Sequence, residues 1–332
     1  MHSRFFTNLR RLNRGGEIPI NPGEDRTISQ DSASILSLWL GCLTGTRELV
    51  AKCQRQCILK GKMPRIVKKI LLLPGVFSYW IKSAGWRATL TWLAYRIRTG
   101  LGFQEPSSLT IQPRQTKFPV IARLGGSSDL SVFKQIFQFE EYACVLNISP
   151  PGLIVDLGAN VGYSSAYFLS RFSAATVVAV EPDPGNFEIC RKNLAPYGDR
   201  AQIVQGAAWS NRSRLVLSRG TFGDGSEWAT QVRQGEGTDG QDVVEGWDMP
   251  SLLELSGRKQ IDLLKVDIER SELELFGPGS LSWLPNVRNI CIELHGDDCK
   301  EVFLEALKNF EYDLGYSGEL TICRNLRRKS NN

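Results

Sequence analysis

Histidine is scarce in this chain, and its cysteines lack the spacing of a metal site. Only His2 and His295 occur among the 332 residues, and none of the eight cysteines forms a pair separated by two residues. Zinc centres are usually built from such cysteine pairs together with nearby histidines. The sequence therefore excludes the common structural zinc modules.

The chain also lacks a long apolar segment. Its longest apolar stretch, residues 70–81, is interrupted by Pro74 and Gly75, whereas a membrane-spanning helix needs about 18 or more continuous apolar residues. No apolar segment with a small-residue cleavage site follows the basic N-terminus, so no secretory signal is predicted. We therefore expect a cytoplasmic protein whose cysteines remain reduced thiols. With 42% apolar and 23% charged residues, the composition is that of a globular protein.

Acidic residues are missing from residues 51–100. This segment holds 11 Lys and Arg residues, whereas 151–332 hold 19 basic and 26 acidic residues. Such asymmetry indicates two parts with different surroundings. Apolar residues recur at helical spacing over 86–98, which predicts an amphipathic helix. We interpret the basic segment either as a solvated or packed helical face or as a peripheral contact with an anionic membrane. Nucleic acid is the less favoured partner.

A change in sequence pattern predicts two domains. Residues 1–105 are expected to form a basic helical N-terminal extension, in which 1–30 are a loose polar tail and 31–60 are helical. Residues 118–326 are expected to form the main domain. The stretch 101–116 contains glycines, prolines and serines and is the predicted boundary.

Apolar strands and helices alternate along the main domain. Continuous apolar strands separated by helices indicate an α/β fold, in which a parallel sheet is covered on both faces. A closing hairpin would add antiparallel strands at one edge. The predicted strands are 120–124, 153–157, 176–180, 201–209, 261–266 and 287–294, the hairpin is 312–326, and the first predicted helix is 130–146.

The strongest motif is a strand followed by a glycine turn, residues 154–165, with the sequence IVDLGANVGYSS. Gly158, Asn160 and Gly162 permit a tight turn, and the next helix presents free N–H groups to an anion. Asp156 at the end of the strand suits an ammonium group. A ligand with both groups is an amino acid, and the methionine end of S-adenosylmethionine (SAM) fits. A nicotinamide-binding turn would have glycine at position 160, so Asn160 disfavours an NAD-dependent oxidoreductase.

A second acidic residue, Glu181, ends the next predicted strand, 19 positions after Gly162. A carboxylate at this place can accept hydrogen bonds from both ribose hydroxyls of a nucleoside. The alternative to a ribose-binding role is that Glu181 caps a helix or faces solvent. Glu181 alone is compatible with NAD as well as SAM, so the choice of SAM rests on Asn160 and the spacing of the turn.

Acidic residues and a histidine stand at the ends of two predicted strands, 261–266 and 287–294. In open α/β sheets, ligands bind beyond the carboxyl ends of the strands. We therefore predict Asp267, Glu269 and His295 as catalytic candidates that accept a proton or orient an acceptor. The two carboxylates are also of a type that binds a divalent cation, but no metal ligand is assigned and metal dependence is left open. The alternative is helix capping and salt bridging with Lys265 and Arg270.

Four segments in this order resemble the FkbM family of class I SAM-dependent methyltransferases: VDLGANVGYSS, VVAVEPDPGNF, IDLLKVDIERSELELFG and ICIELHG. Residues 120–142 are similar to a segment that often precedes the domain in that family, and the resemblance covers about residues 118–310. It implies a Rossmann-like, mostly parallel sheet with helices on both sides. It also implies methyl transfer from SAM, usually to an oxygen of a sugar, polyketide or other small acceptor.

By position, the resemblance implies that Asp156, Gly158, Asn160 and Gly162 hold the methionine part of SAM and that Glu181 holds the ribose. We expect a SAM-dependent methyltransferase that acts on a hydroxyl of a sugar, glycan or small molecule. The alternatives are a non-catalytic binding module with the same fold and a nucleic-acid methyltransferase that uses the basic segment.

The third of these segments departs from the family at one position. Family members commonly have Asp-x-Glu-Gly-x-Glu, whereas this chain has Asp267, Glu269, Arg270 and Glu272. Arginine thus replaces glycine. It either shifts the preference toward an anionic acceptor or is tolerated on an exposed turn, so it bears on the acceptor more than on SAM binding.

Overall fold

The computed structural model describes residues 80–100, 104, 106–218, 231–235, 237 and 242–330. All of them belong to the second of the two units into which the chain divides, Gly75–Asn332. The tail and the helix expected in the first 60 residues lie outside the described residues. The borders of the two predicted domains stay predictions. Among the described residues, no helix is long and apolar enough to cross a membrane.

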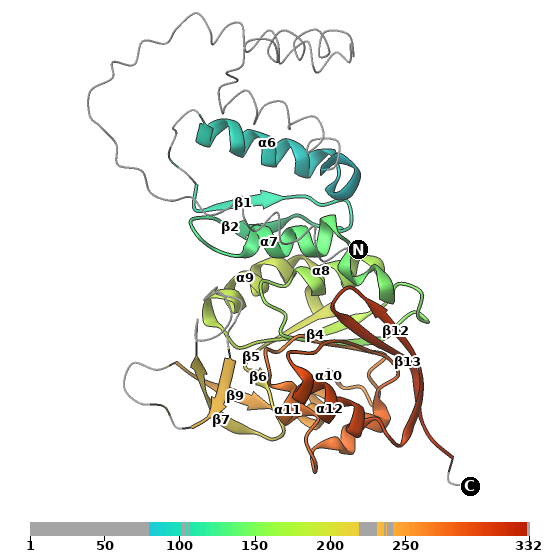
Figure 1. Ribbon diagram of the computed structural model, residues 1–332. Coiled ribbons are helices and arrows are strands. Elements are labelled where there is room, and N and C mark those ends of the chain that lie inside the picture. Colours follow the sequence, from blue (N-terminus) through green and yellow to red (C-terminus); the bar gives the residue numbers. More distant parts are fainter. Residues whose placement is uncertain are drawn as a thin grey trace, which may run out of the picture. The chain divides into compact units, whose positions relative to one another are not determined.

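A seven-stranded sheet forms the centre of this unit, in the order β12-β13-β11-β10-β3-β4-β5. Its strands β12 and β13 lie side by side in Figure 1. Five neighbouring strands of this sheet run parallel to one another, namely β11, β10, β3, β4 and β5. Strand β13 is antiparallel to both of its neighbours, β11 and β12. The predicted α/β class, with its antiparallel C-terminal edge, is confirmed. The strands are β3 (Leu153–Leu157), β4 (Thr176–Glu181), β5 (Ala201–Gln205), β10 (Leu263–Val266), β11 (Ile290–Glu293), β12 (Phe310–Ser317) and β13 (Leu320–Arg328).

Apolar side chains alternate between the two faces of the central strands. Ile154 and Val177 join one buried cluster, and Val155 and Val178 join the other. Both faces are apolar because helices cover both, α8 and α9 on one side and α10, α11 and α12 on the other. These helices are α8 (Tyr163–Arg171), α9 (Pro184–Leu194), α10 (Met249–Ser256), α11 (Glu272–Leu275) and α12 (Asp297–Ala306), with 3₁₀ helices η3 (Ala195–Arg200) and η4 (Leu281–Asn286).

A helix and a strand pair precede the main sheet. Helix α6 (Trp86–Gly100) confirms the predicted amphipathic helix. Strand β1 (Ser108–Ile111) lies within the stretch predicted as a boundary and pairs antiparallel with β2 (Val120–Arg123). The boundary stretch therefore contains regular structure.

The continuous helix predicted over 130–146 is wrong. The chain forms a short helix α7 (Asp129–Phe133), a π-helical segment η1 (Lys134–Gln138) and a 3₁₀ helix η2 (Glu141–Val145). Glu140 separates the last two with a φ of 48°, a left-handed conformation that ends a helix. The apolar periodicity continues across this break, so it does not reveal the break.

The strand predicted over 201–209 is also divided. Strand β5 ends before Gly206, and β6 (Ala207–Ala208) joins a separate four-stranded sheet in the order β6-β9-β7-β8. A Cβ at Gly206 would lie 2.5 Å from the Trp247 ring, so only glycine fits this crossing. The other strands of the small sheet, which were not predicted, are β7 (Ser213–Ser218), β8 (Gln231–Gln234) and β9 (Val243–Trp247).

Candidate active site

The predicted site residues meet at one edge of the main sheet. Asp156 near the end of β3 pairs in register with Lys265 of β10, and Glu181 ends β4. Asp267 follows β10, and Glu293 ends β11. Because these strands are parallel neighbours, their carboxyl ends share an edge. The structure thus brings the predicted Asp156, Glu181 and Asp267 to one edge of the sheet.

The glycine turn is fixed by its contact with the loop after β10. Gly158, Asn160 and Gly162 have φ values of 74°, 50° and 82°, all left-handed. A Cβ at Gly158 would lie 1.8 Å from the carbonyl oxygen of Asp267, and one at Gly162 would lie 2.9 Å from Cys190 Sγ. A larger residue at either position would clash with neighbouring atoms and would also be strained by the left-handed φ, so both positions require glycine. The turn and the Asp267 loop are in direct contact.

Asp156 belongs to a buried network that includes two serines and a lysine. Its Oδ2 accepts hydrogen bonds from the hydroxyls of Ser164 and Ser165, each at 2.6 Å. Lys265 Nζ lies 3.1 Å from Asp156 Oδ1 and donates to the carbonyl of Gly158 at 2.7 Å. Burial lowers the pKa of Lys265, but nearby carboxylates raise it further, above its usual value. In this structure Asp156 thus holds the ammonium of Lys265, and its contact with a methionine ammonium stays a prediction.

Glu181 is buried against the glycine turn. Its Oε2 accepts the N–H of Asn160 at 2.8 Å, and its Oε1 accepts the N–H of Asp183 at 3.0 Å. Burial raises the pKa of Glu181 to about 7, although these hydrogen bonds lower it. The structure thus brings Glu181 and Asn160 together, as a shared ligand site would require.

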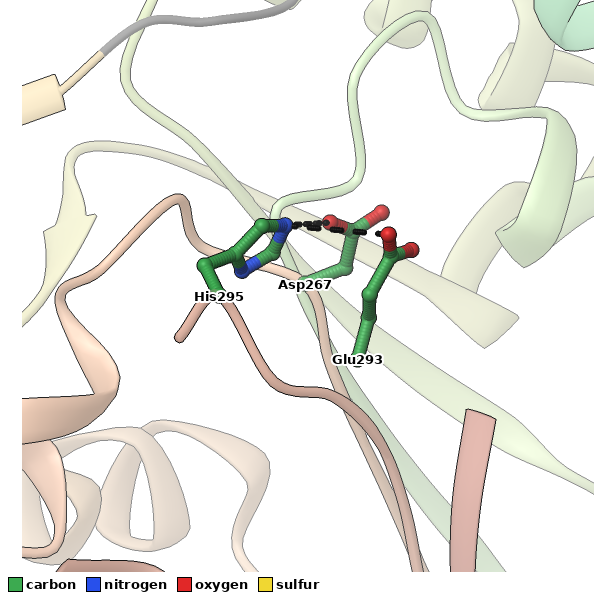
Figure 2. A group of neighbouring side chains, drawn as sticks. All are labelled: Asp267, Glu293 and His295. Atoms are coloured by element: carbon green, nitrogen blue, oxygen red, sulfur yellow. Dashed lines mark ion pairs between the residues drawn. The ribbon is translucent and has the colours of Figure 1, made fainter. Parts of the chain in front are cut away.

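Figure 2 shows His295 beside two carboxylates of the neighbouring strand ends. Its Nε2 lies 3.8 Å from Asp267 Oδ1, from Glu293 Oε1 and from Glu269 Oε2. Its Nδ1 lies 2.8 Å from Oε1 of the fully buried Glu272. A separation of 3.8 Å is too long for a hydrogen bond. The ring is therefore held through Nδ1, while Nε2 faces three carboxylates without bonding to any of them.

These carboxylates change the protonation of the group around His295. Burial lowers the pKa of His295, but the hydrogen bond to Glu272 and the nearby negative charges raise it more, to about 9. Burial and the charge of Asp267 raise the pKa of Glu293 to about 8. At neutral pH both His295 and Glu293 therefore hold a proton. His295 can accept another group's proton only where a ligand lowers its pKa.

Glu293 was missed as a site residue. Successive side chains of a strand point to opposite faces, so Glu293 and His295, two positions apart, are expected on the same side. This signal was present in the sequence. Asp267, Glu293 and His295 each offer one atom within 4.8 Å of the others, a group found among the described residues. Its oxygen and imidazole donors are of a kind that binds divalent cations, and metal dependence stays open.

Arg270 has a defined partner in the structure. It pairs with Asp298, and its guanidinium donates to the carbonyl of His295 at 3.0 Å. Glu269 and Arg270 have φ values of 47° and 75°, which are left-handed and strained for residues other than glycine. This conformation explains why glycine is common here in the family. The side chain that replaces it joins the loop after β10 to the loop that carries His295.

The chain is similar to known methyltransferases over most of this unit. Residues 156–317 match the Methyltransferase FkbM domain. The 2-O-methyltransferase NoeI of Sinorhizobium fredii is 26% identical over 234 residues, which cover 65% of this chain and 92% of that protein. The methyltransferase sdnD of Sordaria araneosa is 28% identical over 191 residues, which cover 49% of this chain and 73% of that protein.

Solved structures show a weaker likeness. A methyltransferase from Geobacter sulfurreducens matches 54% of this chain and 73% of its own, with 18% sequence identity and a TM-score of 0.31. The fold assignment therefore rests on the strand order rather than on this similarity. The domain match and the curated relatives together set aside the oxidoreductase and the non-catalytic module. This chain is a methyltransferase, and its residues 156–317 match the Methyltransferase FkbM domain.

Proposed function

We propose that this chain transfers a methyl group from SAM to a hydroxyl oxygen of a sugar, glycan or other small molecule. The observation that carries this proposal is the contact between the glycine turn and the acidic group around His295. The Gly158 backbone approaches Asp267 so closely that a Cβ would lie 1.8 Å from its carbonyl oxygen. A cofactor held at the turn would therefore present its reactive end to Asp267, Glu269 and His295.

The residues at this edge fit the chemistry of SAM, which supplies an already activated methyl group on a sulfonium. Glu181 would hold the ribose, because its carboxylate is fixed beside Asn160 and can accept hydrogen bonds from a diol. The turn containing Gly158, Asn160 and Gly162 would hold the methionine part. The carboxylates of Asp267 and Glu269 would attract the positively charged sulfonium when SAM binds.

Asp267, Glu269 and His295 would also bind the acceptor hydroxyl. A hydroxyl must lose its proton as its oxygen takes the methyl group, so a base or a water path must face it. Asp267 and Glu269 are 31% and 27% exposed and can accept that proton or hold the hydroxyl. His295 orients the acceptor while it carries its own proton. Most of the rate would come from positioning, since the methyl is already activated.

Oxygen of a sugar is the favoured target for two reasons. Carboxylates accept hydrogen bonds from hydroxyl groups, and several of them surround His295. NoeI, which is similar to this chain over 92% of its own length, is named as a 2-O-methyltransferase.

The decisive experiment is incubation of the purified full chain with methyl-labelled SAM and fractionated metabolites and glycans of the host, followed by mass analysis of the products. The proposal expects label on an oxygen of a hydroxylated product. Label on nitrogen or on nucleic acid would contradict it, and so would the absence of label from every fraction while SAM binds.

The cofactor assignment has a separate test in Glu181→Ala. Loss of two charge-assisted hydrogen bonds, each about 1.5–3 kcal/mol, should weaken SAM binding at least about 100-fold by calorimetry. Glu181→Gln, which keeps the shape, should bind with intermediate affinity. Because Glu181 also holds the N–H of Asn160, a thermal melt of each variant is needed as the control for folding. Unchanged SAM affinity in Glu181→Ala would reject the ribose contact.

A further inference from the structure

Helix α6 carries a stripe of large apolar side chains on its exposed face. Trp86, Leu90 and Ile97 are 60%, 50% and 45% exposed, and Leu93 lies between them, half-buried. Their spacing of four, three and four residues places all of them on one side of an α-helix. Surface helices of globular proteins usually turn such a stripe toward the core, so an outward stripe calls for a partner.

The opposite face of α6 is already packed. Ala88 is fully buried, and Trp92 stacks on Trp80 with ring centroids 5.1 Å apart. Trp80 in turn stacks on Phe133 of α7 at 5.9 Å. The helix is therefore fixed on the core of the unit through one face, and the stripe is held outward.

Positive charge borders the stripe on both sides. At 100° per residue, Arg87 and Arg96 fall on opposite flanks of the line from Trp86 to Ile97. The Arg87 guanidinium lies 5.3 Å from the centroid of the Trp86 ring. Helix α6 contains no acidic residue, and neither does the whole of 51–100, which holds 11 basic residues.

We infer that the exposed face of α6 docks on the surface of an anionic lipid bilayer. An apolar stripe between arginines is the pattern of a helix that lies in the bilayer interface, with apolar side chains among the acyl chains and cations at the headgroups. A nucleic-acid-binding surface needs basic side chains for the phosphates but no row of exposed Leu and Ile side chains, so the apolar stripe favours a lipid surface. An acceptor anchored in the membrane or dissolved beside it would then reach the site in the same unit.

The test is flotation of the full chain with vesicles of phosphatidylcholine alone and of phosphatidylcholine mixed with phosphatidylserine. Binding is expected only to the mixed vesicles and should weaken with salt. Trp86→Ser with Leu90→Ser should lower partitioning about tenfold or more. Each of Arg87→Gln and Arg96→Gln should lower it about fivefold.

The matched control is Leu255→Ser with Leu304→Ser, two apolar residues that are 42% and 41% exposed on α10 and α12. This variant should partition like the unaltered chain. Circular dichroism and SAM binding of every variant show whether it is folded. Three results would overturn the inference: equal flotation with both kinds of vesicle, binding to duplex RNA without binding to vesicles, or partitioning that ignores Trp86 and Leu90.

Discussion

The two charged clusters at the sheet edge differ in how deeply their side chains are buried. Around Lys265, the ammonium lies 2.7 Å from a carbonyl oxygen and 3.1 Å from Asp156, and both side chains are at most 2% exposed. Around His295, three carboxylates stop at 3.8 Å from Nε2, and the side chains are 17% to 31% exposed. The Lys265 cluster is buried on both sides, whereas His295 is hydrogen-bonded to Glu272 through Nδ1 and leaves Nε2 without a hydrogen bond.

This difference separates structural from chemical roles. A buried charge is tolerated only when its partners are close, so the Asp156–Lys265 pair is committed to holding the turn. Charges that are partly exposed and not bonded to each other remain available to a ligand, a cation or a proton. Carboxylates at neighbouring strand ends thus differ in role because of burial and distance, and Lys265, whose Nζ lies 3.7 Å from Asp267 Oδ2, stands between the two clusters. The predictions below test that separation.

The largest effect is expected from Lys265→Met. It would leave the buried carboxylate of Asp156 without its cation, which typically lowers the free energy of unfolding by about 3–5 kcal/mol. Urea unfolding measures this loss. The double variant Lys265→Met with Asp156→Asn should lose less than the two single losses together, because the unpaired charge is gone. Arg327→Gln, in an exposed pair with Glu311, should cost well under about 1 kcal/mol. A similarly small loss in Lys265→Met would show that the Asp156–Lys265 pair contributes little to the free energy of unfolding.

Next in size is the pH dependence caused by Glu181. Its pKa of about 7 in the folded chain exceeds the value of 4.5 expected when unfolded, so the folded state binds more protons between these values. The stability should therefore fall as the pH rises from 4.5 to 7, by a free energy on the order of 3 kcal/mol, and this contribution should then level off. Urea unfolding of the unaltered chain and of Glu181→Gln over this range isolates the contribution. Parallel curves for the two chains would contradict it.

In the group around His295, Asp267→Asn and His295→Ala should each lower turnover about 100-fold or more while SAM binding persists. Turnover is measured once the acceptor is known, and calorimetry follows SAM. Assays with a chelator and with added Mg²⁺ separate proton transfer from cation binding by Asp267, Glu293 and His295. Full activity in both variants would move the assignment to Glu269 and Glu272.

The smallest effect is expected at Arg270. Arg270→Gly removes the pair with Asp298 but also relieves a left-handed φ of 75°. Arg270→Ala removes the same pair and keeps the strain. The melting temperature of the glycine variant should therefore exceed that of the alanine variant by a few degrees. If both variants melt together, the strain inferred from the backbone is absent.

The local parts of the fold and the site were predictable because they depend on neighbouring residues. The strand over 153–157 and the glycine turn after it were predicted from local sequence, and the structure has both. The small sheet and the break at Glu140 were not predictable in this way. The first depends on pairing between strands that are distant in sequence, and the second on one residue with a left-handed conformation.

The sequence by itself determined the strands of the main sheet, the turn after β3 and the acidic strand ends, because each follows from local spacing and residue type. Only the tertiary structure decided which acid is a structural partner and which is open to a ligand. Asp156 and Lys265 lie far apart in sequence and meet through the register of β3 and β10. Glu293 and His295 meet Asp267 through the pairing of β10 with β11. Burial and distances of this kind arise from packing between strands, which local sequence patterns do not specify.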